Sequence, residues 1–126
     1  MIRKTRQRAA IREALESTGR PMSPEEVLAA AQKQVNGLGI ATVYRNLKSL
    51  VEEGWLVTVE LPGQSARYEL AGKDHHHHFH CEKCGRVFEL HGCVERLAEL
   101  VPAGFKMTGH DLLLYGQCRA CRDEKA

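Results

Sequence analysis

The chain has 126 residues and a mass of 14.1 kDa, enough for one or two small folding units but not for a large enzyme with its own cofactor domain. Its 43% hydrophobic and 27% charged residues are typical of a soluble globular protein. No apolar run approaches the roughly 20 residues that cross a bilayer, and no apolar signal core opens the chain. We therefore expect a cytoplasmic protein with no membrane partner. The net charge of +2 gives only a weak overall attraction for nucleic acid.

The N-terminal segment is nevertheless locally basic. Five positive side chains precede the first acidic residue, Glu13, and most of them lie on a first helix expected over residues 5–17: Arg3, Lys4, Arg6, Arg8 and Arg12. A second helix has an explicit start. Ser23 is the N-cap, Pro24 takes the first helical position, and Glu26 follows three residues after the cap, which together form a capping box.

A third helix is predicted over residues 40–53. Its apolar residues share one face: Val43, Leu47, Leu50 and Val51. Small, hydroxyl and basic residues share the other face, with Tyr44 at the flank: Ala41, Thr42, Arg45, Lys48 and Ser49. Small side chains permit close approach to DNA, and an arginine can bind guanine through two hydrogen bonds. The same pattern also suits an ordinary amphipathic helix with a solvated face.

The residues after the third helix favour DNA binding. Residues 55–60 and 66–70 are predicted strands, joined by a turn at Pro62 and Gly63. Three helices followed by a two-stranded ribbon are the order of a winged helix-turn-helix, in which a hairpin lies beside a DNA-reading helix pair.

The second half contains all five cysteines and all seven histidines. Two C-x-x-C pairs stand out: Cys81 with Cys84, and Cys118 with Cys121. Two such pairs can fill the four corners of a tetrahedral, closed zinc site with a structural role. The competing interpretation, a thioredoxin-like redox pair, is disfavoured because no βαβ pattern surrounds either one.

Four consecutive histidines, residues 75–78, precede the first cysteine pair. In an extended segment, His75 and His77 would point to one face, and His76 and His78 to the other. The run therefore predicts two separate imidazole pairs, each needing further ligands. An engineered tag is disfavoured because the run is internal, whereas a disordered metal-binding tract remains an alternative.

The remaining segments predict a small α/β unit. A strand is expected over residues 86–90, then a helix with Val94, Leu97 and Val101 on one face, then a strand in which Leu112 and Leu114 offer an apolar dimer surface. Cys93, at the start of this helix, is either a small buried residue or an extra ligand or redox-sensitive thiol.

Five stretches resemble the ferric uptake regulator family of metal-dependent repressors. They are residues 5–8 (TRQR), residues 39–45 (GIATVYR), residues 67–70 (RYEL), the histidine run into Cys81-x-x-Cys84-Gly85, and His110 through Leu114-Tyr115-Gly116-x-Cys118. The resemblance implies an α+β fold. Residues 1–72 would form a winged-helix DNA-binding domain, and residues 73–126 a metal-binding dimerisation domain. It also implies a homodimer that binds an operator when it is loaded with metal, and no enzymatic activity.

The resemblance further implies three metal sites and a DNA-binding surface. Cys81, Cys84, Cys118 and Cys121 would hold structural zinc. A regulatory site that binds zinc or iron would use Glu69, His76 and His78. A second site would use His75, His77, Glu95 and His110. DNA contacts would come from Arg6, Ala41, Thr42, Tyr44, Arg45 and Lys48.

The sequence defines the metal ligands more closely than it defines which metal the protein senses. In iron and peroxide sensors of the family, the regulatory site commonly includes a further histidine from the DNA-binding domain. This chain has Pro21 at about that position, so water or a residue such as Glu60 would complete its regulatory site. This absence disfavours a peroxide sensor. The all-histidine run resembles zinc uptake regulators, so zinc is favoured and iron is the alternative. A metal buffer is one rival class, but it does not explain the third helix. A metalloenzyme is another, but no nucleophile or dedicated acid/base pair stands out in the sequence.

Overall fold

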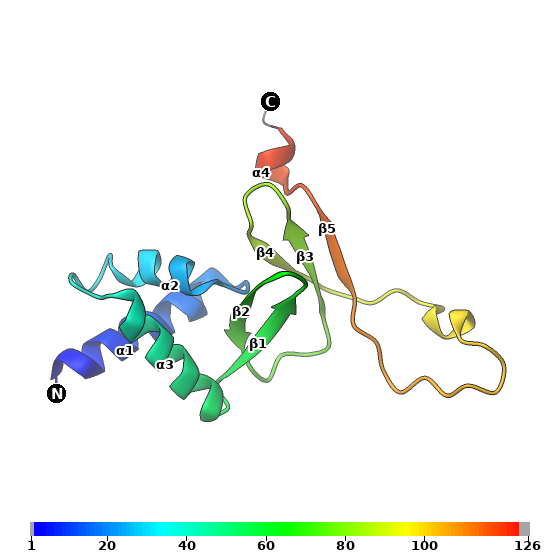
Figure 1. The fold of residues 1–126 in the computed structure, drawn as a ribbon, viewed down its shortest axis with the longest axis horizontal. Coiled ribbons are helices and arrows are strands. Elements are labelled where there is room, and N and C mark those ends of the chain that lie inside the picture. The colour runs from blue at the N-terminus through cyan, green and yellow to red at the C-terminus, as the bar shows by residue number, and fades with distance from the viewer. Residues whose placement is uncertain (1, 124–126) are drawn as a thin grey trace. The chain divides into compact units, whose positions relative to one another are not determined.

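A computed structural model describes residues 2–123 (Figure 1). The chain forms two compact units, and the boundary between them in the sequence falls between Lys73 and Asp74. The sequence placed this boundary after residue 72. Among the described residues, no helix is both long enough and apolar enough to span a membrane.

The N-terminal unit has the predicted winged helix-turn-helix order. Its elements are α1 (Ile2–Thr18), α2 (Pro24–Ala31), α3 (Ile40–Glu52), β1 (Leu56–Leu61) and β2 (Gln64–Leu70). The two strands pair antiparallel, with Leu56 opposite Leu70. A backbone bridge between Met22 and Tyr68, with both N–H···O distances 2.9 Å, ties this ribbon to the segment before α2.

The predicted capping box starts α2. The Oγ of Ser23 accepts a hydrogen bond from the backbone N–H of Glu26 at 3.2 Å, and Oε1 of Glu26 accepts one from the N–H of Ser23 at 3.1 Å. Arg20 adds an ion pair to Glu26 at 2.6 Å. Two otherwise unsatisfied N–H groups are thereby paired at a helix N-terminus, where a negative charge is also favourable.

The apolar face of α3 packs into the core of this unit. Val43, Leu47 and Leu50 are almost completely buried, together with Ile11 of α1 and Val27 of α2. The burial repeats with the helical period, as the sequence predicted, and the opposite face is left to solvent.

The C-terminal unit is a small three-stranded sheet. Its elements are β3 (His77–Cys81), β4 (Val87–Leu90), the 3-10 helix η1 (Leu97–Leu100), β5 (Leu113–Gly116) and α4 (Arg119–Arg122). The strand order is β4-β3-β5, with β4 antiparallel and β5 parallel to β3. Because of these directions, β3 and β5 begin at the end of the sheet where β4 finishes. At the other end of the sheet, β3 and β5 finish and β4 begins.

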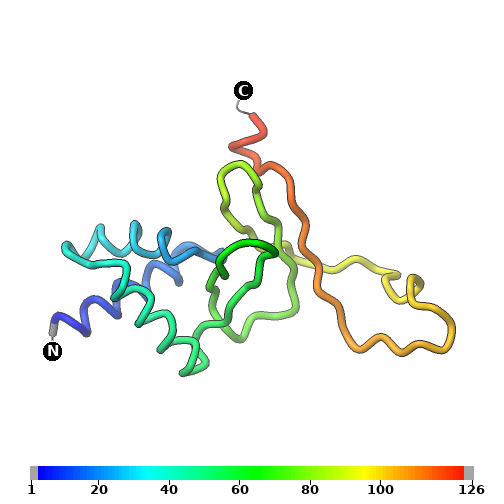
Figure 2. The backbone as a smooth tube through the Cα atoms, viewed as in Figure 1, coloured from blue at the N-terminus to red at the C-terminus, as the bar shows by residue number. Residues whose placement is uncertain are grey.

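The predicted helix containing Val94, Leu97 and Val101 is wrong. The chain instead leaves the sheet after β4 and returns to β5 through a long excursion that contains only η1 (Figures 1 and 2). Arg96 has a left-handed φ of 71°, and Val94 is 53% and Leu100 80% exposed. A short helix is marginal unless its apolar face is buried, and these two apolar side chains are not buried here. Cys93 is correspondingly exposed rather than buried.

Candidate metal centres and DNA-reading helix

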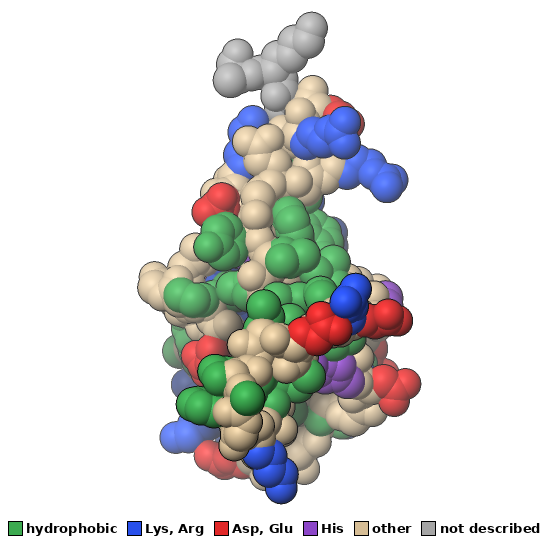
Figure 3. Space-filling view, turned by 90° about the vertical axis from the view of Figure 1, so that its right-hand side faces the viewer, with side chains coloured by type: hydrophobic (Ala, Val, Ile, Leu, Met, Phe, Trp, Pro, Cys, Tyr) green, Lys and Arg blue, Asp and Glu red, His purple; other side chains and the backbone are tan. Residues whose placement is uncertain are grey.

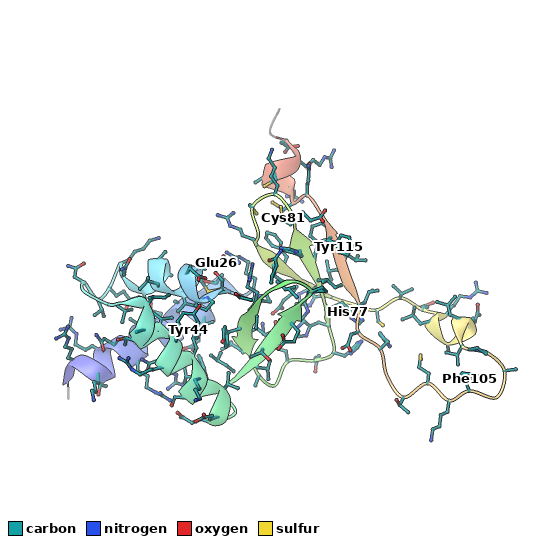
Figure 4. All side chains as sticks on the ribbon, in the orientation of Figure 1. Glu26, Tyr44, His77, Cys81, Phe105 and Tyr115 are labelled. Carbon is teal, nitrogen blue, oxygen red and sulfur yellow. The ribbon has the colours of Figure 1, made fainter. Side chains whose placement is uncertain are left out.

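The two ends of the C-terminal sheet each gather a cluster of metal-ligand side chains. Figure 4 labels His77 and Cys81, the first and last residues of β3, which belong to different clusters. A single strand of five residues thus separates an imidazole cluster from a thiol cluster.

The thiol cluster contains the four cysteines predicted from the sequence. The sulfur atoms of Cys81, Cys84, Cys118 and Cys121 lie within 4.8 Å of one another, and those of Cys84 and Cys118 are 3.9 Å apart. In a tetrahedral site with zinc–sulfur bonds of ordinary length, neighbouring sulfurs are about 3.8 Å apart. The donor set and the spacing therefore both fit a structural zinc ion with no open position.

Local backbone geometry prepares this cluster for metal. The backbone N–H groups of Cys84 and Cys118 both donate to Sγ of Cys81 at 3.4 Å, which is the knuckle arrangement around a bound thiolate. The N–H bond from Cys84 is the main reason that the pKa of Cys81 is lowered to about 5, against the opposing effect of burial. Burial and the adjacent thiol of Cys118 raise the pKa of Cys121 to about 12. Neighbouring thiols resist joint ionisation unless a cation balances their charge, and a bound zinc ion would supply that charge.

The imidazole cluster contains three of the four residues predicted for the second site. His75, His77 and His110 come together, and the fourth group within 4.8 Å is the thiol of Cys93. Glu95 is not part of this cluster. The sequence left Cys93 open as either a small buried residue or an extra ligand, and the structure places its thiol among the ligand-type groups of this cluster.

Electrostatics favours the neutral form of the central histidine. Burial lowers the pKa of His77, and the neighbouring imidazoles of His75 and His110 lower it further. A neutral imidazole is the form that binds a metal.

The other two histidines of the run form a separate pair. The ring centroids of His76 and His78 are 4.8 Å apart, and Nδ1 of His76 lies 2.8 Å from the carbonyl oxygen of Asp74. The alternation expected from an extended segment is therefore present. Glu69, the third residue predicted for the regulatory site, is a buried residue of β2 in the N-terminal unit, and its joint use with these histidines remains a prediction.

The solvent face of α3 carries the residues predicted to contact DNA. Ala41, Tyr44, Arg45 and Lys48 are exposed, Thr42 is half-buried, and Arg45 donates to Thr42 Oγ1 at 3.0 Å. Arg6 of α1 is exposed as well.

Not all of the basic N-terminal segment is available to a ligand. Arg8 binds Ser49 and Glu53 at the end of α3, and Arg12 lies over the ring of Trp55, 4.6 Å from its centroid. These two side chains brace the N-terminal unit, so we expect the other exposed basic residues of α1, Arg3, Lys4 and Arg6, to be the ones that meet a ligand.

Comparison with known proteins identifies the family. The family model of the ferric uptake regulator family matches residues 1–115. The chain belongs to the ferric uptake regulator family. It is a metal-responsive transcriptional regulator and not an enzyme. Regulators of this family bind DNA and act as dimers.

Individual relatives cover almost the whole chain of this family member. The ferric uptake regulation protein of Campylobacter jejuni is 35% identical over 99% of this chain and 83% of its own length. The Helicobacter pylori ferric uptake regulator, whose structure is described as revealing three functional metal-binding sites, is 29% identical, with a TM-score of 0.71 over 95% of this chain and 82% of that one. A zinc uptake regulator, FurB of Mycobacterium tuberculosis, is 31% identical, with a TM-score of 0.54 over 96% of both chains.

Proposed function

We propose that this chain is a homodimeric, cytoplasmic repressor that binds an inverted-repeat operator when zinc occupies its regulatory site. The observation that carries the proposal is the solvent face of α3. This face presents Arg45 and Lys48 beside the small residue Ala41, on a helix whose opposite face is fixed in the core. A helix held in this way can enter the major groove and contact base edges and phosphates.

An exposed apolar surface supports the homodimer. Figure 3 shows hydrophobic side chains gathered on one face. The large hydrophobic side chains that are exposed in the C-terminal unit are Val94, Leu100, Phe105, Met107, Leu114 and Tyr115. Among the described strands of this sheet, β5 lies at an edge. Exposed apolar patches and unpaired strand edges commonly form protein–protein contacts. Two copies joined there would present two recognition helices, as an inverted repeat requires.

The regulatory metal would act through ligands from both units. Glu69 precedes the boundary at Lys73 by a few residues, and His76 and His78 follow it closely. By holding one ion jointly, these residues would restrict the arrangements of the two units to those that fit DNA. Metal shifts the equilibrium among these arrangements only if it binds the DNA-competent arrangement more tightly than the others. The size of the shift is set by that difference in affinity.

Zinc is proposed as the sensed metal because two imidazoles and one carboxylate suit a four-coordinate zinc ion completed by water or Glu60. Residues 1–74 contain no histidine or cysteine that could add a further nitrogen or sulfur ligand. Iron is the second candidate, since a relative 35% identical to this chain is named a ferric uptake regulation protein.

The proposal is tested by replacing His76 and His78 together with alanine and measuring DNA binding by fluorescence anisotropy against free zinc. We expect the double variant to lose the metal dependence that the wild type shows. His91→Ala is the matched control, because this exposed histidine belongs to none of the described clusters. Unchanged metal dependence in the double variant contradicts the proposal, and activation by Fe(II) but not by Zn(II) supports iron as the signal.

A further inference from the structure

The position of Cys93 beside the imidazole cluster is determined by how the chain leaves β4. Gly92 has a φ of 93°, a conformation that glycine adopts readily, and the chain turns there directly after the strand. Cys93 is thereby brought to the sheet end where β3 begins with His77 and where His110 leads into β5. Its sulfur lies 3.3 Å from Nε2 of His77 and 3.0 Å from Nε2 of His110.

The four donor atoms lie within 4.8 Å of one another, and the nitrogen–nitrogen distances from His77 are close to those of a metal site, whereas the sulfur lies a few tenths of an ångström nearer to its two nitrogens. Nε2 of His77 is 3.1 Å from that of His75 and 3.3 Å from that of His110. In a zinc tetrahedron with ordinary bond lengths, two imidazole nitrogens are about 3.3 Å apart, and a nitrogen and a sulfur about 3.6 Å.

Hydrogen bonding alone cannot satisfy this arrangement. Nε2 of His77 has three close neighbours: His75 Nε2, Cys93 Sγ and His110 Nε2. A neutral ring nitrogen offers either one N–H or one lone pair, so it serves only one such partner well. An ion at the centre would bind all four atoms at once.

Glu95, which the family resemblance places in this site, is not one of the four residues in the cluster. It is exposed, and the next residue, Arg96, has left-handed backbone and pairs with Glu99 at 2.9 Å. At the position in the cluster where the resemblance predicts the carboxylate of Glu95, the structure therefore has the thiol of Cys93.

We propose that Cys93 is the fourth ligand of a closed site formed with His75, His77 and His110, and that this site selects zinc over Fe(II) and Mn(II). A thiolate and three imidazoles are soft to borderline donors and leave no open position, which suits tetrahedral zinc, whereas Mn(II) prefers oxygen ligands. This site is separate from the regulatory residues Glu69, His76 and His78, so its selectivity does not depend on which metal they bind.

Cobalt substitution tests the assignment directly. Tag-free protein that retains zinc in the four-cysteine cluster is titrated with Co(II). The zinc content of the filtrates is measured to confirm that cobalt has not displaced this zinc. Because the regulatory residues include no sulfur, a thiolate-to-cobalt charge-transfer band reports Cys93. We expect this band in the wild type, in Glu95→Gln and in the His76→Ala plus His78→Ala variant, and its loss in Cys93→Ser.

Affinity supplies the second measurement. Zinc affinity of this site should fall at least about 10-fold in Cys93→Ser and remain unchanged in Glu95→Gln. Cys93→Asp replaces the thiolate with a carboxylate ligand. This variant should bind cobalt without the charge-transfer band, and its cobalt binding would show that the site still folds. No band in the wild type, a band that survives Cys93→Ser, or a loss of affinity in Glu95→Gln overturns the proposal. The regulatory-site proposal fails separately, in the DNA-binding measurement.

Discussion

Cys93 Sγ lies 3.0 Å from His110 Nε2, although the two residues are 17 positions apart. The contact exists because β4 ends and β5 begins at the same end of the sheet. An exposed thiol held among imidazoles should change its reactivity when a metal binds.

Zinc should therefore protect Cys93 from alkylation. We expect the rate of its modification by iodoacetamide, followed by mass spectrometry, to fall at least about 10-fold when the site is saturated, because a coordinated thiolate is a poorer nucleophile. His110→Ala should restore much of the reactivity in the presence of zinc. Equal rates with and without zinc would show that this sulfur is not a ligand.

The four-cysteine cluster should retain zinc through mild chelation and should be needed for folding of the C-terminal unit. Cys118→Ser removes one of the four thiolates, so we expect loss of the chelator-resistant zinc and a large drop in thermal stability. Structural zinc sites of this kind contribute about 10–16 kcal/mol of apparent binding free energy. Cys93→Ser is the matched control and should keep this zinc. Resistant zinc in Cys118→Ser would contradict the assignment.

Exposed basic residues of α3 should affect DNA affinity without affecting stability. Arg45→Ala should weaken specific binding by about 1–3 kcal/mol, and Lys48→Ala should lower the salt dependence of binding by about one unit of slope. Because both side chains are exposed, unfolding free energies should change by no more than about 0.5 kcal/mol. Lys106→Ala removes the same charge from the C-terminal unit and should have little effect. Equal losses in all three variants would indicate a general charge effect.

Glu26 should make the N-terminal unit sensitive to acid. Burial raises its pKa, but the hydrogen bonds from Arg20 and from the N–H of Ser23 outweigh burial and hold the pKa below its ordinary value of 4.5. A lowered carboxyl pKa stabilises the fold above the pKa of the unfolded chain, and this stabilisation is lost as the pH falls through the folded-state value. Glu26→Gln should therefore be destabilised by about 1–2 kcal/mol near neutral pH.

Denaturation of wild type and Glu26→Gln side by side provides the check. The difference in unfolding free energy between them should shrink as the pH is lowered from about 7 to about 3, because Glu26 becomes protonated and loses its charge. Loss of zinc in acid affects both proteins alike and therefore cancels in the difference. A difference that stays constant over this range would show that the charge on Glu26 is not its source.

The exposed strand β5 should hold two copies together. Leu114 is 46% exposed at this sheet edge, so Leu114→Asp should shift the protein from dimer to monomer in analytical ultracentrifugation. Val57, which is 42% exposed on the ribbon of the N-terminal unit, provides the control substitution Val57→Asp. A dimer that survives Leu114→Asp, or that Val57→Asp breaks equally, would place the interface elsewhere.

Local signals were sufficient to predict the N-terminal unit from sequence. Ser23 and Glu26 mark the start of α2 through their own hydrogen bonds, and Val43, Leu47 and Leu50 repeat with the helical period because they face one core. The paired cysteines were equally informative, since their spacing is that of a tetrahedral site.

The segment between β4 and β5 could not be predicted in the same way. The spacing of Val94, Leu97 and Val101 is helical, but spacing cannot show whether a surface is present to cover that face. For a related reason, the sequence could not decide whether Cys93 is a buried residue or an extra ligand. Its place in the cluster depends on the turn at Gly92 and on the parallel pairing of β3 with β5, both of which emerge only in three dimensions.

Metal-dependent recognition of DNA is the central claim, and selection from a random duplex library tests it most directly. Tag-free protein is presented with the library in buffered free Zn(II) and, in parallel, with a chelator that leaves the four-cysteine zinc in place. The account predicts enrichment of one inverted repeat with zinc and none with the chelator. Recovery of the same repeat under both conditions, or of no sequence at any level of zinc or Fe(II), would contradict it.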